Sequence, residues 1–266
     1  MKKIYLLPFM IMALLFTNCK KDDNKDDEEG GGSNDKKAVP TVIKNFDANN
    51  ALTSEDTYTY DERAITKKTT VAGSDTTINT YHYSDKTKGL LDSIVSMKNG
   101  IFNGVTKFEN NNDLISRTET YDANRALTSR TDFTHYNGQN PDQFRMLIRT
   151  TQYGDINIIG TMTYTSDNMA TMNLTGSISG ITFNQSTTNT YDSKKEPFTN
   201  VITLFEPKTR VNNILSMVSD MNSSMGNQHQ VNTFTYTYNS DDYPTRVDLS
   251  QDSQAQGHLE YTYEEK

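Results

Sequence analysis

Short strands that end in tyrosine recur along most of this chain. Residues 233–238 read TFTYTY, so that aromatic side chains share one face and threonines the other, as in a half-buried strand. A turn segment recurs as well: residues 47–54 read DANNALTS and residues 122–129 read DANRALTS, with seven of eight positions identical. The intervals between strand-end aromatics fit a strand, a turn and a returning strand, so the repeated unit is a β-hairpin.

Turns rich in Asp, Asn, Ser or Gly follow the strand-end tyrosines, and these residues tolerate the left-handed conformations that join antiparallel strands. The tyrosines of the repeat are Tyr60, Tyr83, Tyr121, Tyr136, Tyr164, Tyr191, Tyr238 and Tyr263. A tyrosine joins a flat apolar ring to a hydroxyl, so these eight are candidate core residues and candidate ligand-stacking residues. We expect most to fill the core, and the absence of tryptophan weakens the sugar-stacking alternative.

The repeat predicts an all-β protein with roughly sixteen to eighteen strands, whereas an open twisted sheet rarely exceeds about ten. We therefore predict a single large curved antiparallel sheet or an incomplete barrel, built from consecutive β-hairpin repeats, with tyrosines lining one face. The other face carries Thr, Asn, Asp, Lys and Arg, where a membrane barrel needs an apolar band. A membrane barrel is therefore not expected.

The segment 211–225 departs from this pattern. Four apolar residues there are spaced four, three and four apart before a glycine: Ile214, Val218, Met221 and Met225. That spacing is typical of a short amphipathic helix. The alternative, which we favour, is a strand over 214–218 followed by a polar loop over 219–230.

The N-terminus has the order of a lipoprotein export signal. Lys2 and Lys3 precede an apolar run over 4–16, which is too short to span a bilayer, and the single cysteine of the chain, Cys19, follows. We predict that residues 1–18 are a signal peptide and that Cys19 carries the lipid that anchors the protein in the outer membrane. Asn18 departs from the small residue that usually precedes such a cysteine, and the alternative is a secreted protein from which Cys19 is trimmed.

A charged segment follows the cysteine. Residues 19–37 mix Lys, Asp and Glu with glycines, a composition typical of a flexible tether, and residues 38–266 form the predicted hairpin domain. The stretch KKDDNKDDEE resembles the lysine and acidic pair that directs Bacteroidetes lipoproteins to the outer face of the outer membrane. That resemblance makes Lys21, Asp22 and Asp23 a candidate surface-export signal, and the alternative is a solvated charge run.

Composition excludes several function classes. A formal net charge of −8 and a pI near 5.0 argue against a nucleic-acid partner, whose phosphates need a basic face. With one cysteine the mature chain has no disulfide. His82 and His135 each precede a strand-end tyrosine on the threonine face, without the accompanying ligands of a metal site, so we predict no metal and no cofactor.

Two segments resemble a known family. YDSKKEPF at 191–198 and YTYNSDDYPTR at 236–246, together with the Cys19 tether, resemble a Bacteroidetes surface lipoprotein domain family of unknown function, with a porin-like fold and tyrosine/aspartate-type hairpin repeats. The resemblance implies a porin-like fold and a location on the outer membrane, facing the cell exterior. It implies no activity and no catalytic residue.

The functional prediction is a cell-surface lipoprotein that acts as a binding or scaffold module. Its specific ligand is left open, with a glycan and a peptide as the candidates. Turn chemistry accounts for the many aspartates, and no nucleophile with its base is evident, so the sequence favours a protein that is not an enzyme. The alternative is a glycan-active hydrolase whose carboxylates come from separate hairpins. The oligomeric state is left open.

Overall fold

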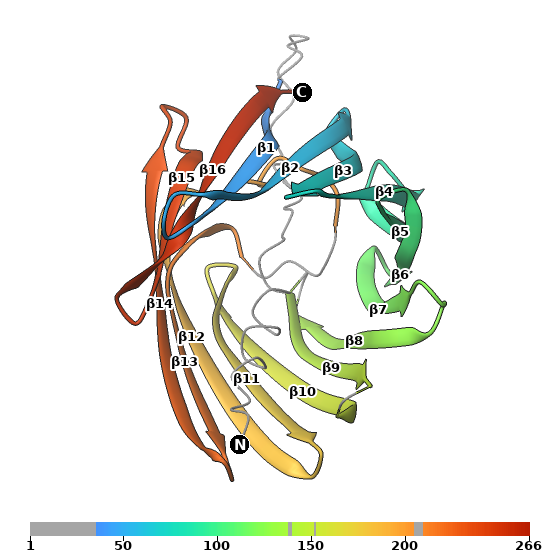
Figure 1. Ribbon diagram of the computed structural model, residues 1–266, viewed down its shortest axis with the longest axis vertical. Helices are drawn as coiled ribbons and strands as arrows, with labels where there is room; N and C mark the ends of the chain where they lie inside the picture. The colour runs from blue at the N-terminus through green and yellow to red at the C-terminus, as the bar shows by residue number, and fades with distance from the viewer. Residues whose placement is uncertain (1–35, 138–139, 152, 205–209) are drawn as a thin grey trace.

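Sixteen antiparallel strands form a closed barrel (Figure 1). The computed structural model describes residues 36–137, 140–151, 153–204 and 210–266, and the side chains of all of these except 135–137. The strands are β1 (Ala38–Asp47), β2 (Leu52–Asp61), β3 (Ala64–Ala72), β4 (Asp75–Asp85), β5 (Leu90–Lys98), β6 (Ile101–Asn111), β7 (Leu114–Asp122), β8 (Leu127–Asn137), β9 (Asn140–Thr150), β10 (Gly154–Thr165), β11 (Asn168–Ile178), β12 (Ile181–Lys195), β13 (Asn212–Ser223), β14 (Gly226–Tyr238), β15 (Pro244–Gln251) and β16 (Gln254–Glu265). Each strand pairs with its neighbours in the sequence.

The sheet is closed by the pairing of β1 with β16, which runs from Ala38 opposite Glu265 to Asp47 opposite Gly257. The all-β antiparallel fold of consecutive hairpins is confirmed, but the predicted open sheet or incomplete barrel is wrong. Closure removes the two unpaired edges that an open sheet would present to solvent or to other chains.

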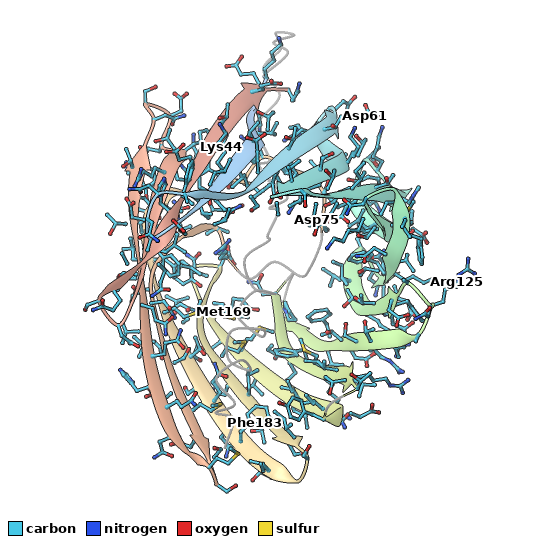
Figure 2. The ribbon with its side chains drawn as sticks, in the orientation of Figure 1. Lys44, Asp61, Asp75, Arg125, Met169 and Phe183 are labelled. Atoms are coloured by element: carbon cyan, nitrogen blue, oxygen red, sulfur yellow. The ribbon has the colours of Figure 1, made fainter. Side chains whose placement is uncertain are left out.

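The wall is largely apolar inside and polar outside along β10 to β12. Along β10, Ile156, Ile158 and Met162 are buried while the alternating Asn157 and Thr161 are exposed. The same alternation continues along β11 and β12, and two residues of these strands, labelled in Figure 2, belong to the buried apolar cluster: Met169 and Phe183. This arrangement is the reverse of a transmembrane barrel, which turns its apolar side chains outward to lipid.

Among the described side chains, six tyrosine hydroxyls tie neighbouring strands together at one end of the barrel. Each tyrosine lies near the end of an even-numbered strand, and its hydroxyl donates to a carbonyl oxygen near the start of the preceding strand. The pairs are Tyr60 with Pro40 (2.6 Å), Tyr83 with Ile65 (2.6 Å), Tyr164 with Pro141 (2.8 Å), Tyr191 with Met169 (2.8 Å), Tyr236 with Ile214 (3.0 Å) and Tyr263 with Pro244 (2.8 Å). We call this end of the barrel the tyrosine rim.

The tie explains why the repeat places a tyrosine at the strand end. On β6 the same position holds Asn110, whose Nδ2 donates to the carbonyl of Leu91 at 2.8 Å. The tie thus needs a side-chain donor that reaches the carbonyl on the neighbouring strand. An apolar aromatic ring of the same shape would leave that carbonyl without this hydrogen bond.

Substitution of Tyr60 separates the contribution of the tie from that of the ring. Tyr60→Phe should lower the free energy of unfolding by about 1 kcal/mol through the lost hydrogen bond, and Tyr60→Ala by about 3 to 5 kcal/mol through the lost packing. Denaturant unfolding measures both. If Tyr60→Ala unfolds at the wild-type denaturant concentration, the ring does not contribute to the core.

Two described tyrosines of the repeat do not make this tie: Tyr238, whose hydroxyl donates to Asp192, and Tyr121. Tyr121 ends an odd-numbered strand, and it pairs with Val105 on the outer face at the opposite end of the barrel. Its hydroxyl donates to Glu119 at 2.6 Å, and the amine of Lys107 lies 5.5 Å from its ring centre. Tyr121 therefore belongs to a charged surface cluster, and Tyr121→Ala is the natural control for Tyr60→Ala.

The segment 211–225 consists of β13 and the turn that follows it, and β14 begins at Gly226. The predicted strand is confirmed within β13, but the predicted polar loop and the helical alternative are both wrong. The alternation of apolar and polar residues along β13 is not evident in the sequence because one inward-facing position holds a polar residue. That residue is Ser219, which is buried and hydrogen-bonded to Thr187 at 3.0 Å. A polar patch of the inner wall, with Gln185 beside it, thus breaks the apolar signal of this strand.

The repeated DANxALTS segment is a turn motif. Asp47 Oδ1 accepts from the backbone N–H groups of Asn49 (2.8 Å) and Ala51 (2.9 Å), and Asp122 makes the corresponding bonds with Asn124 and Ala126 (both 2.9 Å). The residue that takes the left-handed conformation is fourth in each motif, with φ of 62° and 63°. In Figure 2 the residue at this position in the second motif, Arg125, points away from the barrel.

Candidate binding site

One long connection crosses the tyrosine rim. Residues 196–204, which we call the strap, leave the end of β12 and run to the turns on the other side of the barrel (Figure 1). Asn200 Nδ2 donates to the carbonyl of Ala38 at 2.7 Å, the N–H of Ile202 to that of Arg63 at 3.2 Å, and the N–H of Leu204 to that of Gly89 at 2.9 Å. The strap therefore bridges the starts of β1, β3 and β5.

Buried side chains hold the strap in place. Val201 and Thr203 are fully buried, and Phe198 packs edge-on against Tyr58 with ring centres 5.5 Å apart. Thr203 Oγ1 accepts from the N–H of Ile65 at 2.8 Å and lies 2.6 Å from the hydroxyl of Tyr83. The strap is thus part of the core beneath the rim.

A hollow of about 700 Å³ opens beside the start of the strap. Its wall is formed by the ends of β12 and β16, the starts of β1 and β13, the strap and the turn between β14 and β15. The residues that carry the argument below are Lys36, Lys37, Lys194, Lys195, Asn200 and Tyr243. This is the candidate binding site.

The two family-like segments meet in this wall. The hydroxyl of Tyr238 donates to Asp192, and Lys194 Nζ lies 2.6 Å from Asp242 Oδ1. Segments 191–198 and 236–246 are thus joined side by side. The shared sequence pattern therefore corresponds to one place in the fold.

Tyr243 is the most informative residue of the wall. Its side chain is 6% exposed, and its hydroxyl accepts from Asn200 Nδ2 at 2.7 Å. Its ring packs against Tyr263 with centres 5.4 Å apart, and the amine of Lys195 lies 4.6 Å from the centre of the Tyr243 ring. Since the hydroxyl accepts from Asn200 and bonds to no acceptor among the described residues, its hydrogen is available to a ligand.

Sequence reasoning missed Tyr243 because it follows a turn and does not end a strand. The turn itself has the repeat chemistry: Asn239 Oδ1 accepts from the N–H groups of Asp241 at 3.1 Å and Tyr243 at 2.9 Å. The tyrosine stands within the quoted YTYNSDDYPTR segment, so the family resemblance was the signal that contained it.

The eight predicted tyrosines do not form one surface. Tyr263 packs against Tyr243 of the hollow, and Tyr238 bonds to Asp192, the residue before the lining residue Ser193. Tyr60 and Tyr83 pack against the core cluster that contains Phe198 and Val201 of the strap. Tyr191 ties β12 to β11, Tyr164 ties β10 to β9, and Tyr121 is on the outer face. The side chain of Tyr136 lies outside the described residues, as do Cys19, Lys21, Asp22 and Asp23. The seven described tyrosines are partly exposed, so core packing and ligand contact stay alternative roles for them.

The described histidines do not gather into a metal site. His82 is exposed on the threonine face, His229 lies 2.7 Å from Asp220 on the outside, and His258 stacks on Phe46 with ring centres 4.4 Å apart. Among the described residues, no group of three or more His, Cys, Asp or Glu side chains is placed to hold a metal ion. The side chain of His135 lies outside the described residues.

Burial changes the acidity of the inner tyrosines. Burial raises the pKa of Tyr191 to about 12, against the opposing effect of the nearby Arg210 guanidinium. Burial likewise raises the pKa of Tyr236, Tyr261 and Tyr263 well above the ordinary phenol value.

An alkaline titration tests this environment. A folded-state pKa above the unfolded value of about 10 means that the protonated phenols contribute stability below pH 10, and that this contribution is lost as the pH rises through about 12. Tyrosinate absorbance should therefore rise in two stages, the second together with unfolding. A single stage near pH 10 in a barrel that stays folded would contradict the buried phenols.

Known structures share this architecture. A porin-like protein from Bacteroides vulgatus ATCC 8482 superposes with a TM-score of 0.51 and 11% sequence identity, over 86% of this chain and 99% of that one. A porin-like protein from Bacteroides uniformis ATCC 8492 gives a TM-score of 0.51 and 12% identity, over 85% of this chain and 96% of that one. The chain shares their fold.

The predicted porin-like fold is thereby confirmed, whereas membership of the lipoprotein domain family stays a prediction. No protein-family model matches the chain, and no curated protein matches its sequence. Within the described part of the chain, no helix is long and apolar enough to cross a membrane.

Proposed function

We propose that this protein is a lipid-anchored binding module of the outer membrane, and that the hollow beside the strap is its binding site. The observation that carries the proposal is the hollow itself, in which a buried tyrosine hydroxyl with a hydrogen to donate stands beside the amine of Lys195. A fixed donor next to an exposed amine suits a polar ligand better than an apolar one.

The barrel would sit in water above the membrane. Its outer face carries threonines, asparagines and charged pairs such as Lys44 with Glu55 and Arg117 with Asp132, which lipid would not solvate. The porin-like neighbours fit an outer-membrane role, and Cys19 would supply the attachment. The export signal at Lys21, Asp22 and Asp23 would place the module on the cell exterior.

A screen of the full chain against glycans and peptides tests the binding function. Binding should fall at least about tenfold in Tyr243→Phe, which removes only the hydroxyl, and should be unchanged in Tyr121→Phe on the outer face. Thermal melting of both variants checks that the fold is intact. Binding that is insensitive to Tyr243→Phe would place the ligand elsewhere on the protein.

The hydrolase alternative has one observation in its favour, because Asp241 and Glu265 both line the hollow. A glycosidase needs two carboxylates on opposite sides of the scissile bond. Scoring the glycan screen for released product distinguishes the two functions. Product that disappears in Asp241→Asn or Glu265→Gln would establish the hydrolase, and binding without product would support the module.

A further inference from the structure

We infer that the ligand of the hollow carries a phosphate group, held by Lys36, Lys195 and the hydroxyl of Tyr243. This inference rests on the proposed function and adds the chemical class of the ligand. Three donors of the right kind line one hollow, and two of them are amines.

The charge around the hollow is unbalanced. Four lysines line it, Lys36, Lys37, Lys194 and Lys195, against two carboxylates, Asp241 and Glu265. One of the four, Lys194, is paired with Asp242, which stands just outside the lining. Among the described residues at the hollow the surplus is positive, with four lysines against three carboxylates when Asp242 is counted, although the whole chain carries a formal charge of −8.

Lysines elsewhere on the tyrosine rim are matched by carboxylates. Lys86 pairs with Asp61 of the neighbouring turn, which is labelled in Figure 2, and Lys88 Nζ lies 2.7 Å from Asp113 Oδ2. Lys266 at the end of the chain pairs with Glu264 at 2.9 Å. Nearby carboxylates therefore neutralise these amines, and Lys194 at the hollow is matched in the same way by Asp242.

Lys195 and Lys36 have no carboxylate partner among the described residues. Lys195 is held above the face of Tyr243, which fixes its amine at the hollow without neutralising it, because a ring attracts a cation but carries no net charge. Lys36 is exposed at the start of the described chain. An ammonium without a counterion beside a fixed hydroxyl donor is a suitable partner for an anionic oxygen.

Phosphate suits this set of donors because it offers several oxygens at once. The hydroxyl hydrogen of Tyr243 can serve one oxygen, and the two amines can serve the others. The Tyr243 hydroxyl is held in place by Asn200 of the strap and by the ring of Tyr263. Little conformational entropy is therefore lost when a ligand binds to it.

The phosphate could belong to a membrane headgroup or be free in solution. Lys36 is 17 residues from Cys19, so a lipid on Cys19 would keep the hollow within about 60 Å of the headgroups, the length of the extended segment. Inorganic phosphate has the same chemistry. The experiment therefore has one arm for each source.

The test is the rate at which an amine-reactive reagent labels individual lysines of the full chain, read by mass spectrometry. In one arm the protein is reconstituted in vesicles of phosphatidylcholine alone or of phosphatidylcholine with phosphatidylglycerol. In the other arm it is held in neutral detergent and titrated with inorganic phosphate. Lys98, paired with Asp75 at the opposite end of the barrel, is the internal control.

We expect vesicles with phosphatidylglycerol, whose phosphate keeps a net negative charge, to slow the labelling of Lys36 and Lys195 relative to vesicles of phosphatidylcholine alone. Inorganic phosphate should do the same in detergent, and neither should change the labelling of Lys98. In Tyr243→Phe the phosphate concentration for half-protection should rise about tenfold, and in Lys98→Gln it should not change. Lys36→Gln, at an exposed position with no ion pair to another described residue, gives a second variant that leaves the fold intact and should weaken protection of Lys195.

Protection in the vesicle arm alone assigns the headgroup, and protection by inorganic phosphate assigns the free ion as well; both support the inference. Equal labelling with and without phosphatidylglycerol in the vesicles, together with equal labelling with and without inorganic phosphate in detergent, would overturn the inference. Protection that persists unchanged in Tyr243→Phe and Lys36→Gln would overturn it as well. The proposed function would survive that failure if the glycan and peptide screen still shows binding that depends on Tyr243.

Discussion

Replacing Gly89 with alanine is expected to displace the strap and to lower the melting temperature of the barrel. Gly89 has φ of +70°, and a Cβ there would lie 1.6 Å from the carbonyl oxygen of Ile202. The strap backbone cannot yield easily, because the N–H of Leu204 is bonded to the carbonyl of Gly89 itself. Overlap and backbone strain together should cost about 3 kcal/mol.

For a chain of this size that cost corresponds to a fall of roughly 6 to 12 °C in melting temperature. Gly73→Ala is the matched control, since Gly73 has φ of +59° with no atom within 4 Å of the added Cβ. It should show the backbone strain alone, about 1 kcal/mol. Limited proteolysis should cut the Gly89→Ala protein within 196–204. Equal losses in the two variants would mean that the strap does not press on Gly89.

Replacing Cys19 with alanine is expected to move the protein from the membrane fraction to the soluble fraction. Lipid chains on this cysteine would supply the anchoring signals of the mature chain, since stable attachment needs more than one acyl chain. Fractionation of cells followed by immunodetection measures the change. Unchanged fractionation would contradict the lipoprotein prediction.

A separate variant tests which side of the outer membrane the protein faces. Replacing Asp22 and Asp23 with asparagine should leave the protein membrane-bound but change it from protease-accessible to protease-protected in intact cells. Asp26→Asn with Asp27→Asn alters the same charge further along the tether and should have no effect. If the protein becomes protease-protected in both double variants, the total charge of the tether determines its orientation and there is no local export signal.

Some features of this fold can be predicted from short segments of the sequence. The alternation in TFTYTY predicts a strand with an aromatic inner face, and β14 places Phe234 and Tyr236 there. The two DANxALTS segments predict equivalent turns, since an aspartate that caps its own turn needs only the next four residues. The tyrosine repeat predicts hairpins, but the acceptor of each hydroxyl, such as Pro40 for Tyr60, lies on the other strand and has no signature of its own.

What the sequence by itself determined is the unit: strand, tyrosine, turn and returning strand, because each depends on backbone preferences and on contacts within one hairpin. Only the tertiary structure decided that the units close into a barrel, since Ala38 and Glu265 pair across almost the whole chain. It alone placed the strap, whose bonds from Asn200 to Ala38 and from Leu204 to Gly89 join segments with no shared pattern. The hollow depends on both levels. The sequence supplies Lys36, Lys195 and Tyr243, and the tertiary structure makes them neighbours when the first strand meets the last and the strap crosses beside them.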